Sequence, residues 1–214
     1  MTPPVTPPVF DAAFQARLEA LFRWRRDVRH FRPDPVPEAA LERLLALAAL
    51  APSVGLSQPW RFVLVEDAAR RAWLRENFRR SNAEALAAQP AERAARYARL
   101  KLAGLEEAPC LLALFALPDP AQGHGLGRRT MPQTLDYSAV MAAHTLWLAA
   151  RAEGLGLGWV SILEPEGMAA ALAVPAEWRF IGLFCLGYPQ ADSETPELQR
   201  EGWETPHPAP LLRR

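Results

Sequence analysis

The apolar residues of the segment 10–24, "FDAAFQARLEALFRW", recur at the spacing of an α-helix. They lie three or four positions apart, which places them on one face of the helix; the members of this face are Phe14, Leu18, Leu21 and Phe22. The same period carries the stripe on to Arg25 and Arg29, with Asp27 between them. The sequence therefore predicts two cations on the core-facing row of a helix, where an unpaired charge would be costly.

Apolar runs of strand length alternate with longer helical patterns along the rest of the chain. Helices are predicted over residues 38–50, in two charged segments within 68–107 that break near Pro90, and over 137–154, which is apolar almost all round and therefore buried. Strands are predicted over residues 61–67, 110–117, 157–163 and 180–188. Interleaved helices and continuously apolar strands predict an α/β or α+β sandwich with helices on both faces of one sheet.

One domain over residues 1–214 is expected, because no linker or internal repeat divides the chain. The 21 prolines are concentrated in "TPPVTPPV" and "TPHPAPLL". They predict extended, non-helical tails over residues 1–9 and about 204–214. These tails are either disordered or lie along a partner subunit.

Charge and composition exclude several classes of protein. Lys plus Arg and Asp plus Glu both total 24, so there is no basic surplus for nucleic acid. No apolar stretch approaches the ~20 residues of a membrane span, and the N-terminus lacks the pattern of a signal peptide. Cys110 and Cys185 stand alone in apolar runs and are expected to be buried structural thiols. A cytoplasmic location is expected by elimination.

Several common chemistries have no support in the sequence. The four histidines are far apart without an HExxH pattern, so no metal site is expected, and His144 is expected to be a core residue of its helix. Ser161 is predicted inside a strand rather than on a GxSxG elbow, which argues against a hydrolase. The glycines of "GLGLGW" follow a helix and precede a strand, the reverse of the order that binds pyrophosphate, so no direct NAD(P) site is expected. Those glycines fit a tight turn or an approach of bare backbone to a flat ligand.

Two polar features have both a structural and a functional interpretation. Ser53 and Gln58 lie on a proline-flanked turn in "APSVGLSQPWRF", where they either complete an ordinary loop or read the edge of a heterocycle. Arg25 and Arg29 either end a helix at its negative pole or bind an anion, and a phosphate suits guanidinium groups best.

Four segments together resemble the nitroreductase-like FMN proteins: "RRDVRHF", "APSVGLSQPW", "LWLAARAEGLGLGWVSI" and "CLGYP". The resemblance runs from about Arg23 to Trp203. It implies an α+β three-layer sandwich with a mainly antiparallel sheet, built as an intertwined homodimer with FMN at the subunit interface. Asp27 within "RRDVR" and Ser161 within "GWVSI" are similar to the branch of that family that destroys its flavin, and the resemblance makes them a catalytic pair.

The resemblance also implies flavin contacts. Residues that resemble contacts to the phosphate and ribityl chain are Arg25, Arg26, Arg29 and, beside them, Asp27. Residues that resemble the surroundings of the isoalloxazine ring are Ser53, Gln58, Trp60, Gly158, Trp159 and Ser161. One departure is that Glu204 follows Gly202-Trp203 where family members often carry a basic residue, although Arg200 precedes it. Position 204 therefore lacks the cation that the resemblance would imply for a C-terminal phosphate contact.

The reaction implied by this resemblance consumes reduced FMN and O2. It yields 5,6-dimethylbenzimidazole, the lower ligand of cobalamin, and erythrose 4-phosphate, so that FMN is a substrate; a separate flavin reductase is a possible partner. A conventional FMN-dependent nitroreductase or flavin reductase, and a non-catalytic flavin-binding protein, remain as alternatives. The role of the long loop over residues 119–133 is open, although loops of that length are usually functional or mobile.

Overall fold

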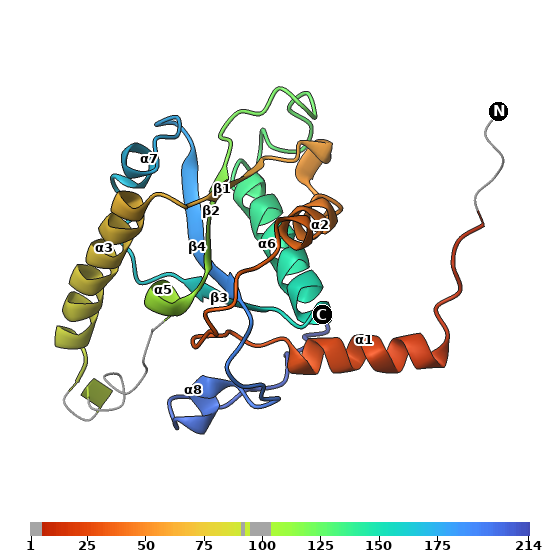
Figure 1. Cartoon of the computed structure of the whole chain (residues 1–214). Coiled ribbons are helices and arrows are strands. Elements are labelled where there is room, and N and C mark those ends of the chain that lie inside the picture. The colour runs from red at the N-terminus through yellow and green to blue at the C-terminus, as the bar shows by residue number, and fades with distance from the viewer. Residues whose placement is uncertain (1–5, 91–92, 95–103) are drawn as a thin grey trace.

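A four-stranded sheet forms the centre of the computed structural model, which describes residues 6–90, 93–94 and 104–214 (Figure 1). The strand order is β1-β2-β4-β3, and every neighbouring pair is antiparallel. The strands are β1 (Trp60–Leu64), β2 (Cys110–Ala116), β3 (Gly156–Val160) and β4 (Arg179–Gly187). This confirms the predicted strands, with shifts of a few residues at their ends, and the α+β class.

Helices cover both faces of the sheet, as the pattern predicted (Figure 1). One face carries α2 (Glu38–Ala48) and α6 (Thr134–Ala152), and the other carries α3 (Ala68–Ala87), α5 (Gly104–Glu107) and α7 (Met168–Ala171). The remaining elements are α1 (Ala12–Trp24), the short 3₁₀ turn η1 (Val54–Leu56) and α8 (Glu197–Arg200). The second charged helix predicted within 68–107 falls largely on residues outside the described ranges.

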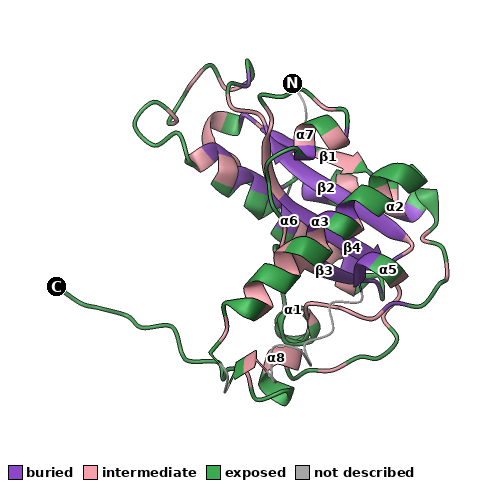
Figure 2. Cartoon of the chain, turned by 90° about the vertical axis from the view of Figure 1, so that its left-hand side faces the viewer, coloured by how far each residue is buried: buried purple, intermediate pink, exposed green. Residues whose placement is uncertain are grey.

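The strand β2 shows how the sheet separates two apolar layers. Its side chains alternate between faces: Leu112 and Leu114 pack in the cluster that contains α6, whereas Leu111 and Phe115 pack in the cluster that contains α3. All of β2 is buried (Figure 2). Cys110 and Cys185 are buried free thiols, as expected, and burial raises the pKa of Cys110 to about 11.

The prediction that Arg25 and Arg29 continue the stripe of the first helix is wrong. α1 ends at Trp24, and Arg25 is already extended with φ −69° and ψ 113°. The chain leaves the helix there because its backbone pairs elsewhere: the amide of Val28 donates to the carbonyl oxygen of Leu157 at 3.1 Å. The apolar stripe itself is not packed in the single chain, since α1 contains no buried residue (Figure 2) and Phe22 is 48% exposed.

Two further predictions are corrected on α6 and β3. His144 is exposed rather than part of the core, because α6 buries only one side, rich in alanine, against the sheet. Ser161 is exposed and lies just after β3, which ends at Val160. Gly154 ends the turn after α6 with φ +75°, as the glycine pattern predicted for a tight turn.

A glycine allows the extended segment 26–30 to lie against the outer edge of β3. Asp27 forms a parallel bridge with Leu157, and a Cβ atom on Gly158 would lie only 2.1 Å from the carbonyl oxygen of Val28. No real side chain fits at that distance. The segment that carries Asp27 is thus attached to the sheet at a point where residue 158 has no side chain.

We expect Gly158→Ala to lower the free energy of unfolding by about 2–3 kcal/mol, the usual cost of overpacking. Gly154→Ala is the control without a steric clash: its Cβ would meet no atom within 4 Å, although its φ of +75° is unfavourable for alanine, so it should cost only about 1 kcal/mol. Denaturant unfolding measures both. Equal losses in the two variants would show that segment 26–30 moves away from β3 without cost.

Candidate active site

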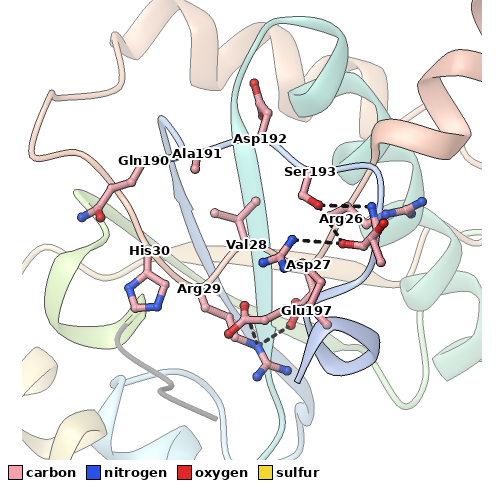
Figure 3. A pocket seen from close by; sticks show the side chains of 12 residues that line it. Arg26, Asp27, Val28, Arg29, His30, Gln190, Ala191, Asp192, Ser193 and Glu197 are labelled. Carbon is pink, nitrogen blue, oxygen red and sulfur yellow. Dashed lines mark hydrogen bonds and ion pairs between the residues drawn. The ribbon is translucent and has the colours of Figure 1, made fainter. Parts of the chain in front are cut away.

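A cavity of about 410 Å³ lies between the segment 26–30 and the segment 190–200 (Figure 3). Arg26, Asp27 and Arg29 line it from the first segment, and Glu197 and Arg200 line it from the second. The two segments are far apart in the sequence, and the sheet brings them together because one borders β3 and the other follows β4. Within "RRDVR", the residues from Arg26 to Arg29 therefore line a cavity, although not on a helix, and Arg25 is not among the lining residues.

Both carboxyl oxygens of Asp27 accept hydrogen bonds at this cavity. Its Oδ1 accepts a hydrogen bond from the backbone amide of Trp159 at 2.9 Å, and its Oδ2 accepts one from Arg29 Nε at 3.3 Å. Burial raises the pKa of the Asp27 carboxyl above its ordinary value; the Trp159 amide, Arg29 and Arg25 oppose this effect without cancelling it. Such a carboxyl can take up a proton more readily than an exposed aspartate.

The Arg29 guanidinium keeps one hydrogen-bond donor unsatisfied within the described part of the chain. Besides Asp27 it meets Glu197, whose Oε2 lies 3.9 Å from its Nε, and its side chain is only 11% exposed. Figure 3 shows Asp27, Arg29 and Glu197 turned toward one another. Arg29 Nη1 is buried without a hydrogen-bond partner in the described part of the chain. Because a buried donor without an acceptor is costly, this nitrogen indicates room for a further acceptor, such as an anionic or carbonyl oxygen of a ligand.

The other two arginines of the motif differ from Arg29. Arg26 Nε donates to the carbonyl oxygen of Glu194 and Nη1 donates to that of Arg25, both at 2.6 Å, so Arg26 ties the two segments together. Burial, and then the charge of Arg25, lowers the pKa of Arg26. The Arg25 guanidinium lies 4.9 Å from the ring centroid of Trp147 on α6, a cation–π contact.

The predicted turn residues Ser53, Gln58 and Trp60 do not line this cavity. Ser53 Oγ accepts from the Gln58 amide at 3.1 Å, and Gln58 Nε2 donates to the Ala49 carbonyl oxygen at 3.1 Å. Gln58 Oε1 accepts from Gln122 Nε2 at 3.0 Å, and Gln122 belongs to the long loop over residues 119–133. In the single chain, these side chains thus stabilise the turn itself, and the long loop contributes one of the hydrogen bonds.

Trp159 connects Asp27 to the end of β3. Its amide binds Asp27, and its ring packs against Phe184 with centroids 4.9 Å apart. Ser161 comes two residues later, beyond the strand and exposed. Gly158 and Trp159 therefore contact the chain's own segment 26–30, and the structure places Asp27 beside the strand end that leads to Ser161.

Three residues that support the cavity wall could not be recognised from the sequence. Glu107 accepts from the Phe31 amide at 2.9 Å, and Gln190 Nε2 donates to the Phe31 carbonyl oxygen at 3.0 Å. Glu197 faces Arg29 from α8. All three lie in polar segments without a recognisable motif, so only the folded chain relates them to Asp27.

No group of three or more His, Cys, Asp or Glu side chains within residues 6–90, 93–94 and 104–214 could hold a metal ion. Over the same described positions, none of the helices is both long enough and apolar enough to cross a membrane.

Comparison with known proteins assigns the family. The nitroreductase family model matches residues 22–188, most of the chain. The chain belongs to the nitroreductase family. A relative in Rhodospirillum rubrum, named 5,6-dimethylbenzimidazole synthase, is 59% identical over 209 residues, which cover 98% of this chain and 99% of the relative. A protein of the same name in Rhodobacter capsulatus is 49% identical, with 96% and 99% covered.

Solved structures agree with this family assignment. Oxidised iodotyrosine deiodinase, whose crystal structure was determined with FMN and 3-iodo-L-tyrosine, is similar to the chain with a TM-score of 0.72 and 25% sequence identity. The match covers 92% of this chain and 97% of that one. The α+β sandwich implied by the sequence resemblance is thus confirmed as the nitroreductase-family fold.

Proposed function

We propose that the protein is an enzyme that fragments reduced FMN with O2 into 5,6-dimethylbenzimidazole and erythrose 4-phosphate, for the lower ligand of cobalamin. The observation that carries this proposal is the partly buried carboxyl of Asp27, held by the Trp159 amide beside Arg29. A site that only bound a phosphate would gain nothing from a carboxyl there, because it weakens the local positive field. The two near-full-length relatives named 5,6-dimethylbenzimidazole synthase support the proposal.

The chain's own residues fit an anionic flavin. Arg29 has an unsatisfied buried nitrogen at the cavity, and Arg25 and Arg26 lie on the same short segment. Arg200 also lines the cavity, so it can supply the positive charge that Glu204 does not. In this proposal these arginines hold the phosphate and ribityl chain, which fixes the rest of the flavin relative to Asp27.

Asp27 and Ser161 carry the protein's part of the reaction. Bound reduced flavin would supply its own reactivity toward O2. Asp27 accepts a proton from the ribityl carbon next to the ring, a role that suits a carboxyl whose pKa is raised. Ser161 forms a hydrogen bond at the ring edge. The reduced flavin comes from outside, with a separate flavin reductase as the proposed source, since the sequence contains no NAD(P) motif.

A homodimer completes the site in this proposal. The turn with Ser53, Gln58 and Trp60 does not line the cavity of its own chain, so a partner's turn would have to supply the ring contacts. Two exposed apolar faces are available for the interface: Phe14, Leu18 and Phe22 on α1, and Tyr137, Val140 and Met141 on α6. Apolar faces of this kind are typical of permanent dimer interfaces.

We expect sedimentation at micromolar concentration to give a dimer, and Phe22→Glu on α1 to weaken it, because a buried unpaired carboxylate would face the partner's apolar surface. Arg17→Glu, an exposed change of charge on the same helix, is the control and should remain dimeric. A stable monomer of the unmodified chain that binds FMN would contradict the shared site.

Single turnover tests the proposed reaction directly. Purified protein is mixed with chemically reduced FMN, air is admitted, and the products are chromatographed while flavin oxidation is followed. The unmodified chain should release 5,6-dimethylbenzimidazole. Asp27→Asn should still bind reduced FMN and let it oxidise, with product lowered roughly 10²–10⁴-fold, the usual cost of losing a general base. Ser161→Ala should lower the product by at least about tenfold.

The pH dependence gives a second measure of the same group. Asp27 acts as a base only when ionised, and a raised pKa moves ionisation to higher pH. Product per oxidised flavin should therefore rise with pH along a limb centred above the ordinary value of 3.8, and Asp27→Asn should lack that limb. Intact oxidised FMN as the only product of the unmodified chain would favour a conventional nitroreductase or a flavin-binding protein instead.

We expect Arg29→Ala to weaken FMN binding by about 1.5–3 kcal/mol, the scale of a charge-assisted hydrogen bond. Riboflavin lacks the phosphate, so its affinity should change little. Arg32→Ala is the control, because Arg32 pairs with Asp34 at 2.9 Å and does not line the cavity. Equal losses of FMN and riboflavin affinity, measured by fluorescence titration, would mean that Arg29 supports the fold and not the phosphate.

A further inference from the structure

Asn77 on α3 is one of three buried polar side chains within the described residues, and it is 2% exposed. Its Nδ2 donates to the carbonyl oxygen of Glu164 at 2.9 Å, and its Oδ1 accepts from the amide of Glu164 at 2.9 Å. The side-chain amide thus satisfies both backbone groups of one residue, as a neighbouring strand would. An asparagine suits this task because its side chain carries one acceptor and a donor group.

The clamped residue lies in the loop that carries Ser161. This loop runs from the end of β3 to α7, and Glu164 is three residues after Ser161. Leu163 packs against the apolar cluster on the α3 face. Ser161 itself is exposed and lies beyond the last paired residue of β3. Past Val160, therefore, Asn77 is the nearest hydrogen-bonding anchor that the structure shows for the backbone around Ser161.

The loop is also fitted to α3 at its far end. Gly167 has φ +81°, and the position of its missing Cβ is 3.6 Å from the Trp73 ring. Trp73 and Asn77 are one helical turn apart on α3, so the same face of this helix lies beside the loop at two places. Of these, Asn77 makes the hydrogen bonds that join the loop to α3.

We propose that Asn77 is a positioning residue for Ser161, acting through the backbone of Glu164. This rests on the proposed function, in which the Ser161 hydroxyl bonds the flavin ring edge. Both hydrogen bonds also stabilise the fold, because the Glu164 amide and carbonyl would lose their partners without Asn77. In addition, the two bonds fix where the loop lies relative to β3 and to Asp27.

Asn77→Leu removes both hydrogen bonds with little change in volume, and Leu74→Ala is the matched control. Leu74 is fully buried on the same helix and has only packing to lose. Both variants should lower the melting temperature. Only Asn77→Leu should speed hydrogen exchange of the amides in residues 161–166, measured by mass spectrometry on the flavin-free protein.

Single turnover with reduced FMN supplies the functional measurement. Asn77→Leu should lower 5,6-dimethylbenzimidazole per oxidised flavin by about 10- to 100-fold, the scale of a small misplacement of a reacting group, with FMN affinity kept. Leu74→Ala should keep the wild-type product fraction. If Asn77 acts through Ser161, the double variant Asn77→Leu/Ser161→Ala should form as much product as the single variant that forms less product.

Three results would overturn the proposal. One is unchanged exchange of residues 161–166 in Asn77→Leu. Another is a normal product fraction despite faster exchange. The third is multiplication of the two losses in the double variant, which would mean independent roles. Failure of the proposed function is distinguishable, because the unmodified chain would then form no dimethylbenzimidazole. The proposed role of Ser161 would then also be wrong. The hydrogen-exchange experiment would still test whether Asn77 holds the backbone of Glu164.

Discussion

The contact between the segment 26–30 and the edge of β3 determines the arrangement of the whole site. The bare Cα of Gly158 lets the Val28 carbonyl approach, the Leu157 carbonyl accepts from the Val28 amide, and the Asp27 carboxyl takes the next free amide, that of Trp159. The position of this carboxyl has two consequences. It completes the hydrogen bonding of a sheet edge, and it is buried enough for its pKa to rise. The cavity, the arginines and the end of β3 are all positioned relative to this attachment.

The elements that the sequence predicted well are those with a strong period. Four strands, α2 and α6 appear close to their predicted positions, because continuous apolar runs and helical spacing leave few alternatives. The end of α1 was predicted poorly for a clear reason. Nothing local stops that helix at Trp24; the chain turns away because Val28 and Asp27 find partners on β3, about 130 residues later in the sequence.

The site was predictable in part. The motif residues Asp27 and Arg29 do meet at a cavity, and resemblance to a family singled them out. Glu197, Gln190 and Glu107 were not predictable, because polar residues in surface segments show no pattern until the fold brings them to one place. Gln58 is the opposite case, because a motif singled it out and yet it does not line the cavity of its own chain. Its side-chain amide instead forms hydrogen bonds with Ala49 and Gln122, which stabilise the turn.

The open apolar face of α1 has a consequence for the life of the chain in the cell. A newly made polypeptide can complete its sheet and both core layers alone, since these lie within one chain. It would then still display Phe14, Leu18 and Phe22 to water. Surface of this kind is what chaperones bind and what drives aggregation. In the proposed homodimer, the abundance of the folded protein should thus depend on how quickly a second chain covers this face, and a low rate of synthesis would lengthen the exposed interval.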